Sequence, residues 1–217
     1  MNFKAILFDL DGTLLDTLED LADACNRVLA EADLPVHPLA SYRYFVGDGL
    51  VTLIMRILPE EMRNKEEIAR MATSFREVYA TNWNAKTKPY DGVESLLDGL
   101  QDNDLPMNVL SNKPDDFTKI CVREFLGNWS FSHVLGNREG MPRKPDPAGA
   151  LEIASKLGFD PMEIVYLGDT STDMQTAVAA GMYPVGALWG FRTTLELEES
   201  GAKRLVSHPE EVLKLFR

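Results

Sequence analysis

The stretch F8-DLDGT-L14 places two carboxylates two residues apart, directly after the apolar run of residues 5–8. A strand with one wet face gives no reason for such a close acidic pair, because the two charges repel each other. The pair therefore predicts a chemical site with positive charge close to Asp9 and Asp11.

Two later predicted strands also end in polar residues. Ser111 and Asn112 follow one of them, and Asp169 follows another, with Asp173 four residues further on. In open parallel sheets, ligands collect outside the carboxyl ends of the strands. We therefore expect these side chains to meet Asp9 and Asp11 at one edge of a sheet.

An acidic cluster at that edge would raise pKa values and cost stability unless something compensated it. A hard divalent cation is the economical solution, and Mg²⁺ fits because it accepts a few carboxylates and keeps water or phosphate oxygens as its other ligands. Ser111 and Lys144 could then hold a phosphoryl group against the ion. The predicted metal-site residues are Asp9, Asp11, Asp169 and Asp173.

Beyond residue 89, predicted strands alternate with predicted helices. This order is typical of a parallel sheet with helices on both faces. We predict helices at 93–101, 115–125, 147–157, 172–180 and 209–216, and strands at 4–8, 107–110, 133–135, 164–167 and 184–187.

Residues 17–85, in contrast, contain no convincing strand. Apolar positions recur at helical spacing from 17 to 32, and Thr17 with Asp20 resembles a helix-capping pair. Further helices are expected at 39–45, 49–58 and 59–83, the last interrupted near Asn64. The sequence thus predicts an all-helical insertion at 17–85 in an α/β core of residues 1–16 and 86–217, with hinges near 16–17 and 87–89.

Composition narrows the class of partner. The net charge of -12 repels a polyanion, so no nucleic-acid partner is expected, and a small anionic substrate would need cations that converge locally. No apolar run approaches the roughly 18 residues of a membrane span, so we expect no membrane partner and a cytoplasmic protein. The two cysteines argue against a disulfide framework. A monomer and a homodimer both remain open.

Four segments, in this order, resemble the four motifs of the haloacid dehalogenase superfamily. They are D-x-D-G-T at residues 9–13, a strand ending in Ser111, Lys144 ahead of Pro145, and G-D-x-x-x-D at residues 168–173. Within that superfamily, the runs at 7–18, 44–55, 110–117 and 166–183 look most like the phosphoglycolate phosphatase group. The resemblance implies a three-layer, Rossmann-like α/β core with a parallel sheet and an inserted all-α helical cap.

The resemblance also implies Mg²⁺-dependent hydrolysis of a small phosphate ester through an aspartyl phosphate. Asp9 would be the nucleophile, and Asp11 would protonate the leaving group and then take a proton from water. Ser111 and the amide of Asn112 would donate to phosphoryl oxygens, and Lys144 would neutralise their charge. Thr13 would add a hydroxyl or a capping bond. Asp9, the backbone carbonyl of Asp11 and Asp169 would ligate the metal, with Asp173 orienting a metal-bound water or Lys144.

The helical insertion would close over the site and contact the substrate. Its turn at Gly47, Asp48 and Gly49 is the expected tip, since glycines permit a tight turn. Arg43 and Arg56 could bind a substrate carboxylate. Asp48 disfavours an anionic substrate, and it leaves sugar phosphates or a broad range open.

Three other functions share these features. A dehalogenase needs no acid at the position of Asp11, which disfavours that function. A phosphomutase of the β-phosphoglucomutase kind would protect the aspartyl phosphate from water until a sugar hydroxyl arrives. A non-catalytic phosphate-binding protein could share the fold, although here every catalytic position is filled.

Overall fold

A six-stranded sheet forms the centre of the computed structural model, which describes residues 2–216. All neighbouring strands of this sheet run parallel. The strand order is β5 (Phe131–Asn137), β4 (Met107–Pro114), β1 (Ala5–Phe8), β6 (Ile164–Gly168), β7 (Tyr183–Ala187) and β8 (Arg204–Val206).

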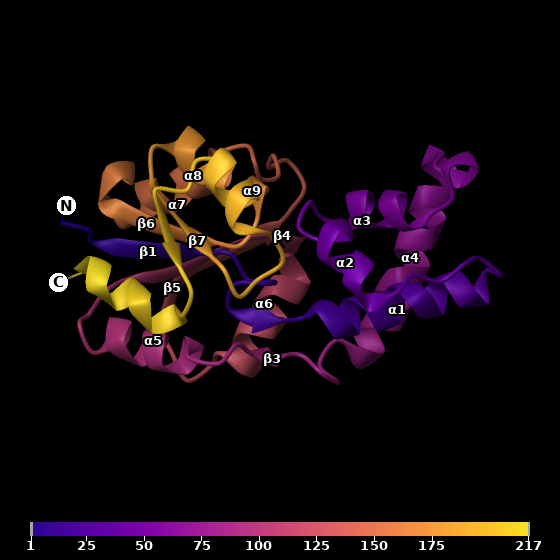
Figure 1. Cartoon of the computed structure of the whole chain (residues 1–217), viewed down its shortest axis with the longest axis horizontal. Coiled ribbons are helices and arrows are strands. Elements are labelled where there is room, and N and C mark those ends of the chain that lie inside the picture. Colours follow the sequence, from indigo (N-terminus) through magenta and orange to yellow (C-terminus); the bar gives the residue numbers. More distant parts are fainter. Residues whose placement is uncertain (1, 217) are drawn as a thin grey trace.

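The sheet is the middle of three layers (Figure 1). Every residue of β1 is buried, because Ile6 and Phe8 face one helical layer and Ala5 and Leu7 face the other. This two-sided burial explains why β1 reads as a continuous apolar run. One layer contains α5 (Val93–Gln101), α6 (Asp115–Phe125) and the 3-10 helix η3 (Pro209–Phe216), and the other contains α7 (Ala148–Leu157) and α8 (Ser171–Ala180).

The core departs from the sequence prediction in several elements. The strand predicted at 107–110 continues to Pro114 through an irregular register with β5, so Ser111 and Asn112 belong to β4. The segment at 209–216, predicted as a helix, is a 3-10 helix. Sequence analysis also missed the short α9 (Thr194–Glu199) and the edge strand β8.

The inserted cap is entirely helical and lies beside the carboxyl edge of the sheet (Figure 1). It contains a hydrophobic cluster of its own, centred on side chains such as Tyr42, Ile54 and Tyr79. Its last helix begins after Asn64, whose side chain caps it by accepting from Glu67 N at 3.0 Å. The elements are α1 (Leu18–Glu31), α2 (Leu39–Phe45), α3 (Leu50–Ile57), the 3-10 helix η1 (Glu60–Met62) and α4 (Lys65–Asn82).

Two chain passages connect cap and core, and they pair as the antiparallel strands β2 (Leu15–Asp16) and β3 (Lys88–Pro89). The predicted capping bond from Thr17 is absent, since α1 has no side-chain cap. The buried Asp20 instead accepts hydrogen bonds from Lys86 N, Thr87 N and Thr87 Oγ1, which ties the two passages together. We propose the domain boundaries at 1–16 with 86–217 and at 17–85; the terminal residues 1 and 217 lie outside the described part.

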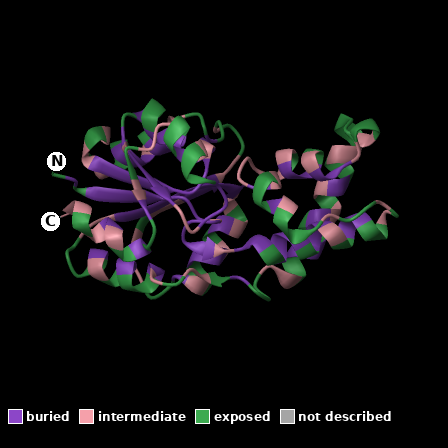
Figure 2. Cartoon of the chain, in the orientation of Figure 1, coloured by how far each residue is buried: buried purple, intermediate pink, exposed green. Residues whose placement is uncertain are grey.

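Burial follows the layers: the central strands β1, β4, β6 and β7 are almost entirely buried, the edge strands β5 and β8 are partly exposed, and the outer faces of the helices are exposed (Figure 2). Across residues 2–216, no helix combines the length and the apolar character needed to cross a bilayer.

Candidate active site

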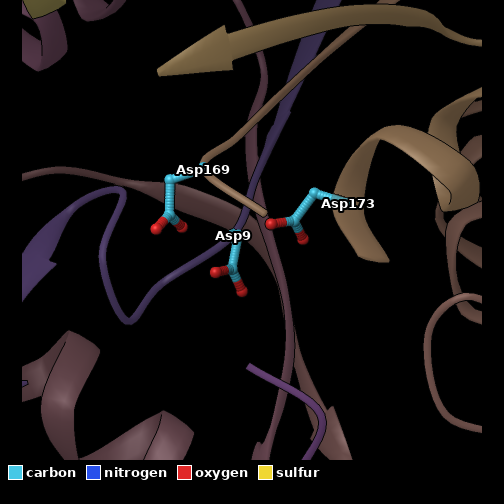
Figure 3. Close-up of side chains that lie close together, drawn as sticks. All are labelled: Asp9, Asp169 and Asp173. Carbon is cyan, nitrogen blue, oxygen red and sulfur yellow. The ribbon is translucent and has the colours of Figure 1, made fainter. Parts of the chain in front are cut away.

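Three carboxylates meet where β1 and β6 end. Asp9 directly follows β1, Asp169 directly follows β6, and Asp173 lies in the first turn of α8. Each offers an oxygen within 4.8 Å of the other two, and all three side chains are buried (Figure 3). The prediction that strand ends would bring these residues to one edge is confirmed.

Lys144 supplies the positive charge expected beside Asp9. Its Nζ donates to Asp9 Oδ1 at 2.7 Å, to Asp173 Oδ1 at 2.7 Å and to Leu110 O at 3.0 Å. Asn112 fixes the backbone of Lys144, because its side-chain amide accepts from Lys144 N and donates to Lys144 O. Asn112 thus positions a cation, a role that sequence analysis did not foresee.

The buried cluster carries more negative than positive charge. Burial, followed by the Asp173 carboxylate, raises the pKa of Asp9 well above its usual range, and Lys144 offsets this only in part. Burial and Asp173 also raise the pKa of Asp169 to about 7. Burial alone would lower the pKa of Lys144, but Asp173 and Asp9 outweigh it and raise that pKa well above its usual range.

This donor set fits a hard divalent cation such as Mg²⁺, because it consists of carboxylate oxygens with one ammonium among three acids. Asp9 and Asp169 are the residues that would hold the ion. Asp169 is oriented for this by Thr13 Oγ1 at 3.0 Å and by Phe191 N at 2.7 Å. Asp173 fits the role of a direct ligand less well, because the Lys144 ammonium binds one of its oxygens, and Thr170 N and Oγ1 bind the other.

Asp11 turns away from this cluster. Its carboxylate accepts from Lys113 Nζ at 3.0 and 3.3 Å, and Lys113 Nζ also donates to Tyr79 Oη of the cap at 2.9 Å. The side chain of Asp11 is therefore no part of the carboxylate cluster, although it lines the same pocket as Asp9. Sequence analysis did not single out Lys113 or Tyr79, and the only available signal was the position of Lys113 directly after Ser111 and Asn112.

A pocket opens from Asp9 and Asp11 toward the cap, with about 620 Å³ of space that includes the open solvent at its mouth. Ser111 and Asn112 line its polar end together with the acidic pair. Gly47 and Gly49 line it from the cap, as expected for the tip of the insertion. The remaining wall is mostly apolar and consists of Leu21, Val46, Leu50, Leu53, Phe75, Pro114 and Phe117, with Arg76, Tyr79 and Lys113 as its other polar members.

Three predicted cap residues face elsewhere. Asp48 accepts from Thr172 Oγ1 at 2.6 Å and pairs with Arg56 at 2.6 Å. Burial raises the pKa of Asp48, but these two contacts outweigh it and hold the pKa below its usual range. Arg43 donates to the carbonyls of Gly190 and Phe191 in the core. The structure thus places Asp48, Arg56 and Arg43 outside the pocket lining, away from where we expected them to meet substrate.

The backbone at position 12 explains why a glycine follows the acidic pair. Its φ is +94°, and a Cβ there would lie 2.7 Å from the Phe191 ring and against the Asp169 carboxylate. Only glycine accepts both the conformation and the contact. Thr13, expected to add a hydroxyl or a capping bond at the site, donates its hydroxyl hydrogen to Asp169 Oδ1 and so orients that carboxylate.

The comparisons with known proteins agree on one family. The family model of haloacid dehalogenase-like hydrolases matches residues 6–187. A phosphoglycolate phosphatase of Haemophilus influenzae (strain 86-028NP) is 31% identical over 204 residues, 91% of each chain. The phosphoglycolate phosphatase of Xylella fastidiosa (strain 9a5c) is 34% identical over 191 residues, 88% of this chain and 82% of its own length.

Solved structures show the same architecture. A predicted phosphoglycolate phosphatase from Haemophilus somnus 129pt superposes with a TM-score of 0.92 at 26% identity, covering 100% of this chain and 99% of that one. A haloacid dehalogenase-like hydrolase from Streptococcus pneumoniae gives a TM-score of 0.89 at 22% identity and 99% coverage of both chains, a likeness of fold alone.

Proposed function

The chain belongs to the haloacid dehalogenase-like hydrolase family and is a phosphatase, and from this premise we propose that it hydrolyses a small phosphomonoester through an aspartyl phosphate on Asp9. The first candidate substrate is 2-phosphoglycolate, which the names of the relatives supply. The observation that carries the mechanism is the position of Asp9, which touches Lys144, lies beside Asp169 and opens into the cap-covered pocket.

In the first step, a carboxylate oxygen of Asp9 attacks phosphorus. Lys144 binds Oδ1, and among residues 2–216 no hydrogen bond is made to Oδ2, which leaves that oxygen as the nucleophile. The new bond joins Asp9 Oδ2 to phosphorus while the bond from phosphorus to the ester oxygen breaks. Asp11 gives its proton to the departing alkoxide.

In the second step, water attacks the phosphorus of the aspartyl phosphate. Asp11, now a carboxylate, takes the proton of that water, and the bond to Asp9 breaks to release inorganic phosphate. Both proton transfers use one carboxyl group two residues from the nucleophile. This economy accounts for the acidic pair in F8-DLDGT-L14.

The phosphoryl group is held from the β4 side. Ser111 lines the polar end of the pocket, and its Oγ accepts from Lys113 N at 3.1 Å, so its own hydrogen can go to a phosphoryl oxygen. Lys144 offsets charge on the transferring group from its fixed place between Asp9 and Asp173. Mg²⁺ held by Asp9 and Asp169 would neutralise the remaining phosphoryl charge.

The cap excludes bulk water from this chemistry. Its tip at Gly47 and Gly49 lines the pocket, and Asn112 Nδ2 donates to Gly47 O at 3.1 Å. That contact joins the cap to a residue that also positions Lys144. Closure of the cap and positioning of Lys144 are therefore linked.

The test is phosphate release, with Mg²⁺ and with excess chelator, across 2-phosphoglycolate, hexose phosphates, nucleotides, pyrophosphate and p-nitrophenyl phosphate. We expect Mg²⁺-dependent release with the highest kcat/KM for 2-phosphoglycolate. Full activity in chelator would remove the metal from the mechanism. Phosphorylated product without released phosphate would support the phosphomutase alternative instead.

A further inference from the structure

Lys113 is a second buried lysine in the site, and the hydrolytic steps above assign it no role. Its side chain is 4% exposed, its Nζ lies 3.0 Å from Asp11 Oδ1, and it donates to Tyr79 Oη at 2.9 Å. The two partners come from different parts of the chain, Asp11 from the core and Tyr79 from α4 of the cap. The lysine therefore lies at the junction that cap closure creates.

Lys113 and Tyr79 together have donor capacity left for a ligand. An ammonium has three N–H groups, and Lys113 Nζ meets both oxygens of Asp11, at 3.0 and 3.3 Å, and the phenol of Tyr79. The N–H on the longer carboxylate contact is the one that a ligand could take. The phenol accepts from Lys113, so its own hydrogen is available. Burial raises the pKa of Tyr79 strongly, and the phenol therefore keeps that hydrogen. Two donors 2.9 Å apart thus line one pocket.

The charge distribution of the pocket shows what this pair would recognise. The Asp9 carboxylate repels an anionic group on the substrate, and Lys144 is engaged by Asp9 and Asp173. The other pocket cation, Arg76, has a side chain 47% exposed and lies 4.0 Å from Asp116. Within the described lining, Lys113 is the buried cation, and Asp11 is its one carboxylate partner, whereas Lys144 has two.

Apart from Arg76 and the polar end of the pocket, the rest of the pocket wall is apolar. Phe75 stacks on Tyr79 with ring centroids 5.2 Å apart, and the Phe117 ring is tilted against the tyrosine at the same centroid distance. The two aromatic rings fix the phenol beside Lys113. A polar group of the substrate that lay against the apolar part of the wall would lose its hydrogen bonds to water without replacement.

We propose that Lys113 and Tyr79 form the specificity element of this enzyme and bind a carboxylate on the leaving group, adjacent to the phosphoester. This inference rests on the proposed phosphatase function and deepens it, because it names the residues that would select a phosphorylated hydroxy acid such as 2-phosphoglycolate. Because Tyr79 belongs to the cap, the element is complete only when the cap covers the site. A carboxylate matches it because both of its oxygens are acceptors and the element offers two adjacent donors.

The test compares two substrates that differ only in the carboxylate, 2-phosphoglycolate and ethyl phosphate. We expect the wild type to prefer 2-phosphoglycolate in kcat/KM, and Lys113→Met to reduce that preference by about 10- to 100-fold, as for loss of a charge-assisted hydrogen bond. Lys113→Arg should keep part of the preference. Lys119→Met, which removes an exposed lysine of α6 whose partner is Asp115, is the matched control and should leave the preference unchanged.

Tyr79→Phe is the second variant, because it keeps the ring packing and removes only the hydroxyl. It should reduce the preference several-fold, mainly through a higher KM for 2-phosphoglycolate. An unchanged preference in both variants, or an active wild type without preference for the carboxylate, would overturn the inference and leave the phosphatase function standing. A wild type that hydrolyses neither these esters nor p-nitrophenyl phosphate would overturn the proposed function and the inference with it.

Discussion

The carboxylate of Asp9 combines three properties: it is buried, it contacts Lys144, and it lines the pocket. Burial removes the water that would otherwise shield a carboxylate, and Lys144 fixes one of its oxygens. The second oxygen is thereby held in place for attack, which is the geometry that a covalent mechanism requires.

Asp9→Asn should abolish turnover while the fold persists. The amide keeps the shape of the side chain but is a poor nucleophile, so we expect kcat to fall on the order of 10⁴-fold or more. The measurement is phosphate release, with circular dichroism as the check on folding. Asp91→Asn changes an exposed aspartate and should retain full activity; comparable activity in the two variants would refute the covalent role.

Asp169 links metal binding to pH. Its folded-state pKa of about 7 lies above the usual 3.8, so between these values the metal-free folded protein binds a proton that the unfolded chain has released. The free energy of unfolding therefore falls as the pH rises through this window. Mg²⁺ binds the deprotonated carboxylates and should reverse that loss.

We thus expect Mg²⁺ to raise the Tm more at about pH 8 than at about pH 6, with a difference on the order of 5 °C. Differential scanning fluorimetry with Mg²⁺ and with chelator measures this directly. Asp169→Asn should lose both the pH dependence and the response to Mg²⁺. A larger Mg²⁺ effect at the lower pH would contradict the assignment of Asp169 as a ligand.

Strand ends were the part of the site that sequence could predict. Asp9, Ser111 and Asp169 lie at or near the carboxyl ends of neighbouring strands, where topology alone brings them together. The contact between Lys113 and Tyr79 depends on how α4 lies against β4, which local sequence patterns do not encode. The same holds for Arg43, whose partners lie in the core loop after β7, and for Arg56, whose partner Asp48 lies in the cap.

Between elements, two arginines join α2 of the cap to the loop after β7. Arg43 donates to the carbonyls of Gly190 and Phe191, while Arg192 donates to the carbonyls of Arg43 and Val46. The guanidinium of Arg192 also lies over the Tyr44 ring, 5.3 Å from its centroid. These contacts hold the cap tip against the core.

Arg192→Ala should loosen this junction without unfolding the core. We expect faster amide hydrogen exchange in α2 and in residues 46–49, and a kcat/KM lowered by about 10-fold, since an open cap admits water and misplaces the tip. Exchange in β1 and β6 should stay unchanged. Arg123→Ala, an exposed change in α6, is the control, and equal exchange in the two variants would show that Arg192 does not hold the cap.

Asp20 has the corresponding role at the hinge. It is 1% exposed and accepts from two backbone amides and one hydroxyl of the returning passage. Asp20→Ala would leave these donors without partners, and we expect a loss of about 3 kcal/mol in the free energy of unfolding. Asp23→Ala, which removes a surface ion pair with Lys86, is the control and should cost less than about 1 kcal/mol. Urea denaturation of both variants measures the two losses in the free energy of unfolding. Equal losses would contradict the hinge role of Asp20.

At the scale of the whole molecule, the order of elements was the strongest sequence signal. Alternating strands and helices beyond residue 89 predicted the parallel sheet, and the strand-free stretch from 17 to 85 predicted the helical cap; the structure has both. The edge strand β8 was missed because only three residues, Arg204–Val206, form it. Its pairing with β7 is a tertiary contact that the local pattern does not reveal.

The proposed domain boundaries follow from the same organisation. Cap and core each bury a hydrophobic cluster of their own, and only two chain passages join them. Such a division lets the cap move as a unit while the carboxylates at the sheet edge stay fixed. Chemistry thus depends on the core, and substrate choice depends on the surface where the cap meets it.

The covalent intermediate is the most direct test of how this molecule works. The enzyme would be quenched in acid during turnover of its best substrate, digested, and analysed by mass spectrometry. We predict one phosphoryl group on the fragment that contains Asp9, and none on that fragment from Asp9→Asn. A phosphoryl group on another residue, or an unmodified Asp9 fragment during rapid phosphate release, would contradict the mechanism.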